Sequence, residues 1–163
     1  MRAHSWVLVL LGARQKRPVY KPWPTSQDPE EVERHVHGGG NIGLLCGPAS
    51  GVAVLDCDDP SAWEEMSDML GRLNPWVLTG SGKYHYPVMF EPDLPAKVVW
   101  RGAIIGEFQR GDGNQQLVVL PPSIHPNGQP YTWLVEPHAQ PPAPLPGLWR
   151  AFLKGWRFGH ARA

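Results

Sequence analysis

Two acidic residues stand at the end of an apolar run, where they could hold a divalent metal ion. Asp56 and Asp58 follow the run 52–55. Side chains alternate across a strand, so both carboxylates are expected on one face, about 7 Å apart, with Cys57 on the other. They repel each other unless a cation lies between them, and carboxylate oxygens suit Mg²⁺ or Mn²⁺. The same residues could instead form an acidic turn that caps the next helix, a task that Asp59 could perform alone.

A third acid, Glu107, lies in the apolar segment 104–109. Alternation places Ile104, Gly106 and Phe108 on one side of this strand and Glu107 on the other. Burying an unpaired charge is costly, so a salt bridge with an arginine is one explanation of Glu107. Metal binding is the other. Three carboxylates from two strands suit a pair of ions that clamps the attacking and leaving oxygens of an in-line displacement.

A glycine-rich turn at residues 79–85 is a candidate phosphate site. Backbone N–H groups around Ser81 and Gly82 could cradle phosphate oxygens, and Lys83 and His85 could add charge. The turn is not a Walker A loop, because that spacing is absent and a strand rather than a helix follows. An ordinary hairpin turn is the alternative interpretation.

Two later segments offer weaker nucleotide contacts. Arg110 lies in a polar, glycine-rich stretch directly after Glu107, where it could bind a phosphate or neutralise that acid. The proline-rich turn 121–126 presents the hydroxyl of Ser123 and the imidazole of His125. Taken alone, that turn is better interpreted as structural.

The elements that would position these residues are strands paired as hairpins, with two inserted helices. Asp28 and Pro29 predict a helix start and glycines 38–40 its end, and a second helix is expected from Pro60 to about Leu73. A first buried strand is expected at 6–11 and an edge strand at 131–135. Hairpins are predicted between 41–46 and 51–56, between 76–79 and 83–90, and between 103–109 and 115–120. This pattern predicts an α+β domain on a largely antiparallel sheet.

Composition favours one globular unit. At 163 residues and 42% apolar, the chain can bury a core. We expect a catalytic domain at 1–136, a proline-rich linker at 137–146, and a basic amphipathic helix and tail at 147–163. The last segment would use five apolar side chains, namely Leu148, Trp149, Phe152, Leu153 and Trp156.

Charge and cysteine content are less decisive. The net charge is zero, but segments 1–21 and 147–163 contain basic residues and no acid. Basic ends could clamp a polyanion around a metal site, and uneven surface charge would explain the pattern equally well. Two cysteines, Cys46 and Cys57, fit a reducing cytoplasm. The apolar run 6–11 lacks a signal-peptide cleavage site and is too short to span a membrane, so no membrane partner is expected.

Taken together, these segments resemble the N-terminal prim-pol domain of the archaeo-eukaryotic primase superfamily, as found in plasmid and phage replication proteins. The resemblance runs from about Trp6 to Trp133, and its parts follow the family's order. They are Arg17-Pro18 with Lys21-Pro22-Trp23; Asn41-Ile42-Gly43, Gly47, Ser50-Gly51 and Asp56-Cys57-Asp58; Thr79-Gly80-Ser81-Gly82 to His85; and Glu107, Arg110-Gly111-Asp112-Gly113, Gln116, the turn 121–126, Gly128, Tyr131 and Trp133.

The resemblance implies a template-directed nucleotidyltransferase, a DNA primase/polymerase acting on DNA and (d)NTPs. Asp56, Asp58 and Glu107 would hold two Mg²⁺ or Mn²⁺ ions, and His85 with the Ser81-Gly82 turn would contact the triphosphate. Nucleotide contacts by Lys83 and by three further residues are also expected, those three being Arg110, Ser123 and His125. The family fold is a modified RRM-like sheet with an accessory α/β unit.

Two departures and two alternatives remain. Lys83 stands where the family usually has a second glycine, and no helical primase C-terminal domain or helicase follows in this sequence, so such a partner is expected in cis or trans. The same carboxylates could serve a two-metal nuclease or other phosphodiesterase. A non-catalytic single-strand or origin DNA-binding module that stacks bases on tryptophans is the second alternative.

Overall fold

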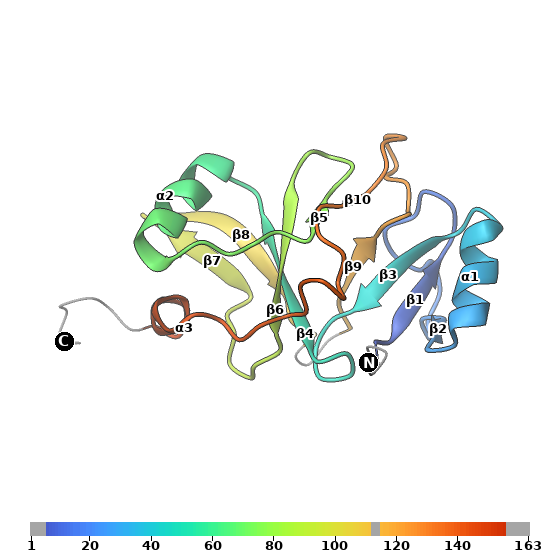
Figure 1. Ribbon diagram of the computed structural model, residues 1–163, viewed down its shortest axis with the longest axis horizontal. Coiled ribbons are helices and arrows are strands. Elements are labelled where there is room, and N and C mark those ends of the chain that lie inside the picture. The colour runs from blue at the N-terminus through green and yellow to red at the C-terminus, as the bar shows by residue number, and fades with distance from the viewer. Residues whose placement is uncertain (1–5, 112–114, 156–163) are drawn as a thin grey trace.

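The computed structural model describes residues 6–111 and 115–155. Within them the chain forms helices at the two ends of a pair of antiparallel sheets (Figure 1). The three described helices are α1 (Pro29–His37), α2 (Pro60–Leu70) and α3 (Gly147–Leu153). The expected α+β class is confirmed, and every strand pair is antiparallel, as expected.

The strands divide into a small and a large sheet. The small sheet has the order β2-β1-β3-β9, with β1 at Leu8–Leu11, β2 at Thr25–Ser26, β3 at Asn41–Leu45 and β9 at Leu117–Leu120. The large sheet has the order β10-β5-β6-β4-β8-β7. Its strands are β10 (Thr132–Trp133), β5 (Val77–Leu78), β6 (Tyr84–Met89), β4 (Val52–Cys57), β8 (Ala103–Gln109) and β7 (Lys97–Trp100).

Two of the three predicted hairpins are wrong. β3 and β4 lie in different sheets and share only an isolated bridge between Gly47 and Val52. Likewise β8 pairs with β4 and β7, whereas β9 pairs with β3. The chain instead passes from one sheet to the other after β3 and after β8, and Gly111 lies against Cys46: a Cβ at Gly111 would lie 2.1 Å from Cys46 O. Only the β5–β6 hairpin is confirmed, together with the edge strand β10.

Two hydrophobic clusters flank the large sheet, and β4 contributes to both. Val52 and Val54 face the cluster between the two sheets. Ala53, Leu55 and Cys57 face the cluster under α2 and α3. The predicted alternation is therefore confirmed, and burial of both faces explains why β4 occupies an inner position of the sheet.

A β-bulge changes the alternation expected along β8. Val98 pairs with Gly106, but Val99 pairs with Ile104, which leaves Ile105 as the extra residue. As a result Ile105 joins Phe108 in the buried cluster, while Ile104 is 54% exposed. The expectation that Ile104 and Phe108 share a side is wrong, because one inserted residue inverts the pattern beyond the bulge.

The helix boundaries follow the predicted signals. Asp28 caps α1 by accepting from Glu30 N at 3.0 Å, and Asp59 caps α2 by accepting from Ala62 N at 3.0 Å. Helix α2 ends at Leu70, before Gly71, rather than at Leu73.

The C-terminal segment packs onto the domain. Ala143 O accepts from Met89 N at 2.9 Å, and Leu145 and Trp149 lie in the cluster with α2. The Trp149 ring lies 5.0 Å from Trp63. Trp156 and the basic tail lie outside the described residues.

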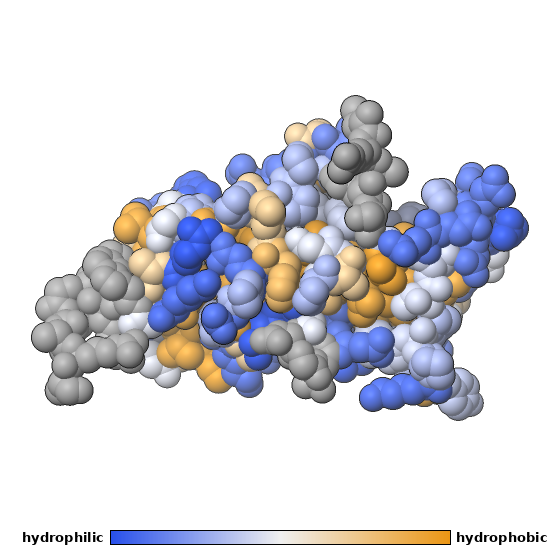
Figure 2. Space-filling model, turned by 90° about the horizontal axis from the view of Figure 1, so that it is seen from below, coloured by the Kyte–Doolittle hydropathy of each residue, from blue (hydrophilic) through white to orange (hydrophobic). Residues whose placement is uncertain are grey.

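The surface combines polar and apolar areas. On the face shown in Figure 2, hydrophilic residues surround and interrupt the apolar ones. None of the helices in the described ranges has the length and apolar character needed to cross a membrane.

Candidate active site

Three candidate site residues form one row across the large sheet. His85 on β6 and Glu107 on β8 are each directly opposite Asp56 on β4. Residues opposite each other in a sheet share a face, so the three side chains point the same way. The expectation that Glu107 and Asp56 share a face is confirmed. Lys97 on β7 extends the row beyond Glu107.

This row lies along a cleft of about 260 Å³ between the two sheets. The row continues the face of β4 that carries Val52 and Val54, so the cleft begins where the apolar contact between the sheets ends. Its lining comes from both sheets and from the β1–β2 loop: Lys16, Arg17, Asp56, Thr79, Ser81, Lys83, His85, Glu107, Gln109, Leu117, Val118, Val119 and Tyr131.

Burial and a neighbouring negative charge disfavour the ionised form of Asp56. Burial, followed by the negative charge of Asp58, raises its pKa to about 6. Its Oδ1 atom is buried without a hydrogen-bond partner among the described residues. The nearest basic atom, His85 Nε2, lies 3.9 Å away, beyond hydrogen-bond distance. A buried unsatisfied oxygen of this kind is costly unless a ligand completes it.

His85 lies beside Asp56 as a neutral imidazole. Burial, followed by the positive charge of Lys16, lowers its pKa to about 4. The contact between His85 and Asp56 is therefore not an ion pair at neutral pH, although the distance alone would allow one. His85 Nδ1 is also buried without a hydrogen-bond partner in the described part of the chain. The His85 side chain is 6% exposed. As a neutral ring, it can hydrogen-bond a bound group without first taking up a proton.

Asp58 is engaged by a lysine. Lys83 Nζ donates to Asp58 Oδ1 at 2.7 Å, and this hydrogen bond raises the pKa of the lysine. The two side chains are 41% and 45% exposed. Glu107 is also half exposed and lies 3.7 Å from Lys97 Nζ, in place of the arginine considered from the sequence.

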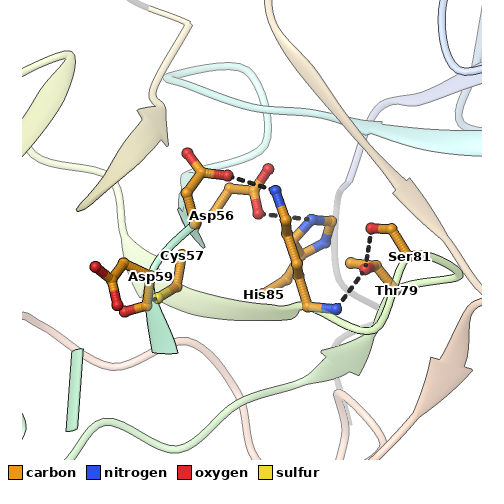
Figure 3. Close-up of polar contacts among 8 residues, drawn as sticks. Asp56, Cys57, Asp59, Thr79, Ser81 and His85 are labelled. Carbon is orange, nitrogen blue, oxygen red and sulfur yellow. Dashed lines mark hydrogen bonds and ion pairs between the residues drawn. The ribbon is translucent and has the colours of Figure 1, made fainter. Parts of the chain in front are cut away.

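The turn before Lys83 has the shape expected of a tight glycine hairpin. Lys83 N donates to Thr79 Oγ1 at 3.0 Å, and Thr79 Oγ1 lies 3.0 Å from Ser81 Oγ (Figure 3). Gly82 has a φ of +83°, which favours glycine. At Gly80 a Cβ would lie 2.3 Å from His125 Cβ, so the adjoining turn leaves no room for a side chain.

The weaker nucleotide contacts lie elsewhere. Arg110 lies just beyond the end of β8, and its Nη1 donates to Leu94 O at 2.8 Å. Ser123 is 2% exposed and accepts from Ile42 N at 2.8 Å. His125 accepts from Asn127 N and packs behind the Gly80 turn. None of the three lines the cleft between the sheets, and Asp58 does not line it either, so nucleotide contacts by Arg110, Ser123 and His125 stay predictions.

Several residues of the cleft lining were not identified as site candidates from the sequence, among them Lys16, Gln109 and Tyr131. Lys16 was counted only as part of a basic segment, although that segment borders the cleft. Gln109 shares the face of Glu107 two residues along β8, and alternation could have identified it. Tyr131, whose pKa burial raises to about 12, reaches the cleft from the loop before β10, and no local signal indicates this.

The candidate carboxylates are chemically suitable ligands for a hard metal ion, but their side chains are not close enough together to bind one. Carboxylates on one face, one with an unsatisfied buried oxygen, are suitable ligands for Mg²⁺ or Mn²⁺. However, in the described ranges no three His, Cys, Asp or Glu side chains stand close enough together to hold an ion. Two of the three carboxylates have a lysine partner instead: Lys83 contacts Asp58, and Lys97 Nζ lies 3.7 Å from Glu107.

Comparison with protein families gives one match. A family model described as "Bifunctional DNA primase/polymerase, N-terminal" matches residues 1–148, a stretch that includes every residue lining the cleft. No curated protein shows a significant match to the chain.

Proposed function

The chain belongs to the family of bifunctional DNA primase/polymerase N-terminal domains, and from that premise we propose that it is a template-directed primase/polymerase. The proposed reaction transfers a nucleotidyl group from a (d)NTP to a 3′-hydroxyl and releases pyrophosphate. The observation that carries the proposal is the row of His85, Asp56 and Glu107 along one cleft, with Lys83 and Lys16 beside it.

Asp56, Asp58 and Glu107 are the proposed ligands of two Mg²⁺ or Mn²⁺ ions. When bound, such ions acidify a 3′-hydroxyl and neutralise the charge that develops on the leaving pyrophosphate. The unsatisfied Oδ1 atom of Asp56 supports this assignment. The raised pKa of Asp56, about 6, also means that this ligand is deprotonated at neutral pH and protonated in mild acid.

The triphosphate is proposed to lie along the turn that precedes β6. His85 would hydrogen-bond a phosphate oxygen as a neutral group, and backbone N–H groups of Ser81 and Gly82 would contact the same chain of phosphates. Lys83 and, from the opposite wall, Lys16 would balance its negative charge.

The proposed partners are a DNA template and primer, with a helicase or helical primase domain in cis or trans. The family membership supports DNA and nucleotides as substrates. A replication role in a plasmid, phage or other mobile element is proposed from the resemblance of the motifs. Cys46 and Cys57 are buried free thiols, which supports a reducing, cytoplasmic setting.

The test is a primer-extension and priming assay with dNTPs or NTPs, in Mg²⁺ and in Mn²⁺. We expect extension by the wild-type chain and a loss of about 100-fold or more in Asp56→Ala, Asp58→Ala and Glu107→Ala, because removal of a metal-site group commonly costs that much. Circular dichroism should show that the three variants remain folded.

The same assay distinguishes the two alternatives. Strand shortening without nucleotide incorporation would identify a nuclease. DNA binding that Asp56→Ala leaves unchanged, with no incorporation by the wild-type chain, would identify a binding module. Either result would contradict the proposed polymerase.

A further inference from the structure

Lys83 contacts Asp58, one of the three proposed metal ligands. Its ammonium donates to Asp58 Oδ1 at 2.7 Å, the strongest contact that this carboxylate makes among the described residues. The neighbouring Asp56 carboxylate has no such partner on Oδ1. One of two adjacent carboxylates is therefore neutralised by a side chain of the protein itself, and the other is left unsatisfied.

The contact lies just beyond the paired part of two strands. Asp56 pairs with His85 in the antiparallel ladder between β4 and β6. Lys83 directly precedes β6 and Asp58 directly follows β4, and the hydrogen bond from Lys83 Nζ to Asp58 Oδ1 joins these two strand ends. The Lys83 backbone is fixed by Thr79, which accepts from Lys83 N through Oγ1 and donates its own N–H to Lys83 O.

The ammonium and a divalent ion cannot share Asp58 Oδ1. Both are cations, and at contact distance they repel each other. The side chain is also mobile enough to leave, because Lys83 is 41% exposed and bonded to the site only through its terminal Nζ atom. Its backbone already lies in the turn assigned to the triphosphate, so rotation of the side chain alone could exchange partners.

We propose that Lys83 is a built-in competitor for the metal ion at Asp58, displaced when the incoming nucleotide offers its phosphates to the ammonium. This inference rests on the proposed function. The ammonium keeps the carboxylate pair partly neutralised before substrate arrives. Metal and nucleotide then bind cooperatively, because each favours the state in which Lys83 has left Asp58, and such coupling is reciprocal.

The test measures Mn²⁺ affinity by isothermal titration calorimetry on the full chain, with and without a non-hydrolysable dNTP analogue. Lys83→Met removes the ammonium at nearly constant side-chain volume. Without nucleotide, we expect it to raise Mn²⁺ affinity by about 2- to 5-fold, the equilibrium equivalent of an exposed ion pair. The increase in Mn²⁺ affinity that the analogue produces should be smaller in Lys83→Met than in wild type.

Lys97→Met is the matched control. It removes the same charge beside Glu107, where the ammonium lies 3.7 Å away, beyond hydrogen-bond distance from that carboxylate. We expect it to change Mn²⁺ affinity less than about 2-fold. Lys83→Arg should keep the low affinity of wild type, because it retains a cation that can donate to Asp58.

Two results would overturn the inference. If Lys83→Met and Lys97→Met changed Mn²⁺ affinity equally, the effect would come from net charge rather than from competition at Asp58. Unchanged or weaker Mn²⁺ binding in Lys83→Met would show that the lysine does not compete. Failure of the metal site itself would appear differently: Asp58→Asn would then bind Mn²⁺ as wild type does, or neither wild type nor Lys83→Met would bind it.

Discussion

Asp56 Oδ1 and His85 Nε2 lie 3.9 Å apart, and the pKa values of the two residues are shifted in opposite directions. Burial raises the pKa of the acid to about 6 and lowers that of the base to about 4. Each is therefore held nearer its neutral form by the same cleft. A metal ion on Asp56 and a phosphate on His85 would relieve both costs, which is why the orphaned atoms of this pair are the best pointer to a ligand in the described structure.

At the residue scale, His85 should make stability depend on pH. Its pKa is lowered from 6.5 to about 4 in the folded state, so the unfolded chain binds the extra proton between those values. Stability is consequently lost as pH falls through that window. Relative to His85→Gln, we expect the free energy of unfolding of wild type to fall by up to about 3 kcal/mol between pH 7 and pH 4.

The measurement is urea unfolding of both proteins in metal-free buffer across that pH range. Asp56 titrates in the same window with the opposite sign, since its folded pKa is raised and protonation in the folded state stabilises. Because Asp56 is present in both proteins, its contribution largely cancels in the difference. Curves that stay parallel from pH 7 to pH 4 would contradict a buried neutral His85.

At the element scale, helix α3 belongs to the core of the domain. Trp149 is fully buried, its Nε1 donates to Gly71 O at 2.6 Å, and its ring packs on Trp63 of α2. The sequence predicted a proline-rich linker at 137–146 and an amphipathic helix after it. The linker itself is anchored, because Gln140 O accepts from Trp76 Nε1 at 2.9 Å.

Trp149→Ala should therefore destabilise the whole domain. We expect a loss of about 3 to 5 kcal/mol in the free energy of unfolding, the usual cost of removing a buried tryptophan. Leu148→Ala, at a neighbouring position of the same helix that is 48% exposed, should cost less than about 0.5 kcal/mol. Chemical denaturation of both variants checks this, and equal, small effects would show that α3 is an appendage.

At the scale of the whole molecule, the site is shared between two sheets. The acids and His85 come from the large sheet, whereas β9 and the β1–β2 loop form the opposite wall. Asn41 on β3 ties this wall together: its side-chain amide donates to Gln15 O and Ile124 O and its carbonyl accepts from Ile124 N. Asn41 is 2% exposed, so the loop that carries Lys16 is anchored by a buried polar contact.

Lys16 should contribute to nucleotide binding from this second wall. Its positive charge lowers the pKa of both His85 and Asp56, which places it within electrostatic reach of the row. We expect Lys16→Met to weaken nucleotide affinity by about 10-fold, as the loss of one charged hydrogen bond would.

Lys21→Met is the control for Lys16→Met, because Lys21 lies in the same loop, is exposed and does not line the cleft. Its effect on nucleotide affinity should stay within about 2-fold. Calorimetric titration with a dNTP in Mn²⁺ measures both variants. If the two substitutions weaken binding equally, the loop acts through overall charge rather than through a contact at the site.

Local sequence patterns were sufficient to predict the helices and the two faces of β4. Asp28 and Asp59 cap their helices as expected, since a cap depends on residues within one turn. Asp56 lies opposite in direction to Leu55 and Cys57, since a strand alternates whatever it pairs with. The same rule, with the order of the motifs, was enough to nominate Asp56, Glu107 and His85 together.

Partner choice and cleft geometry were decided only by the tertiary structure. β3 and β9 pair with each other rather than with β4 and β8, the strands next to them in sequence. Strand pairing depends on burial of faces that distant segments contribute. That choice placed Lys16 and Tyr131 around the site and left Ser123 bonded to β3. The bulge at Ile105 and the bond from Lys83 to Asp58 likewise arise from cross-strand contacts. The sequence alone does not predict these contacts, because the residues next to Ile105 or Lys83 along the chain do not indicate which segment the folded sheet brings beside them.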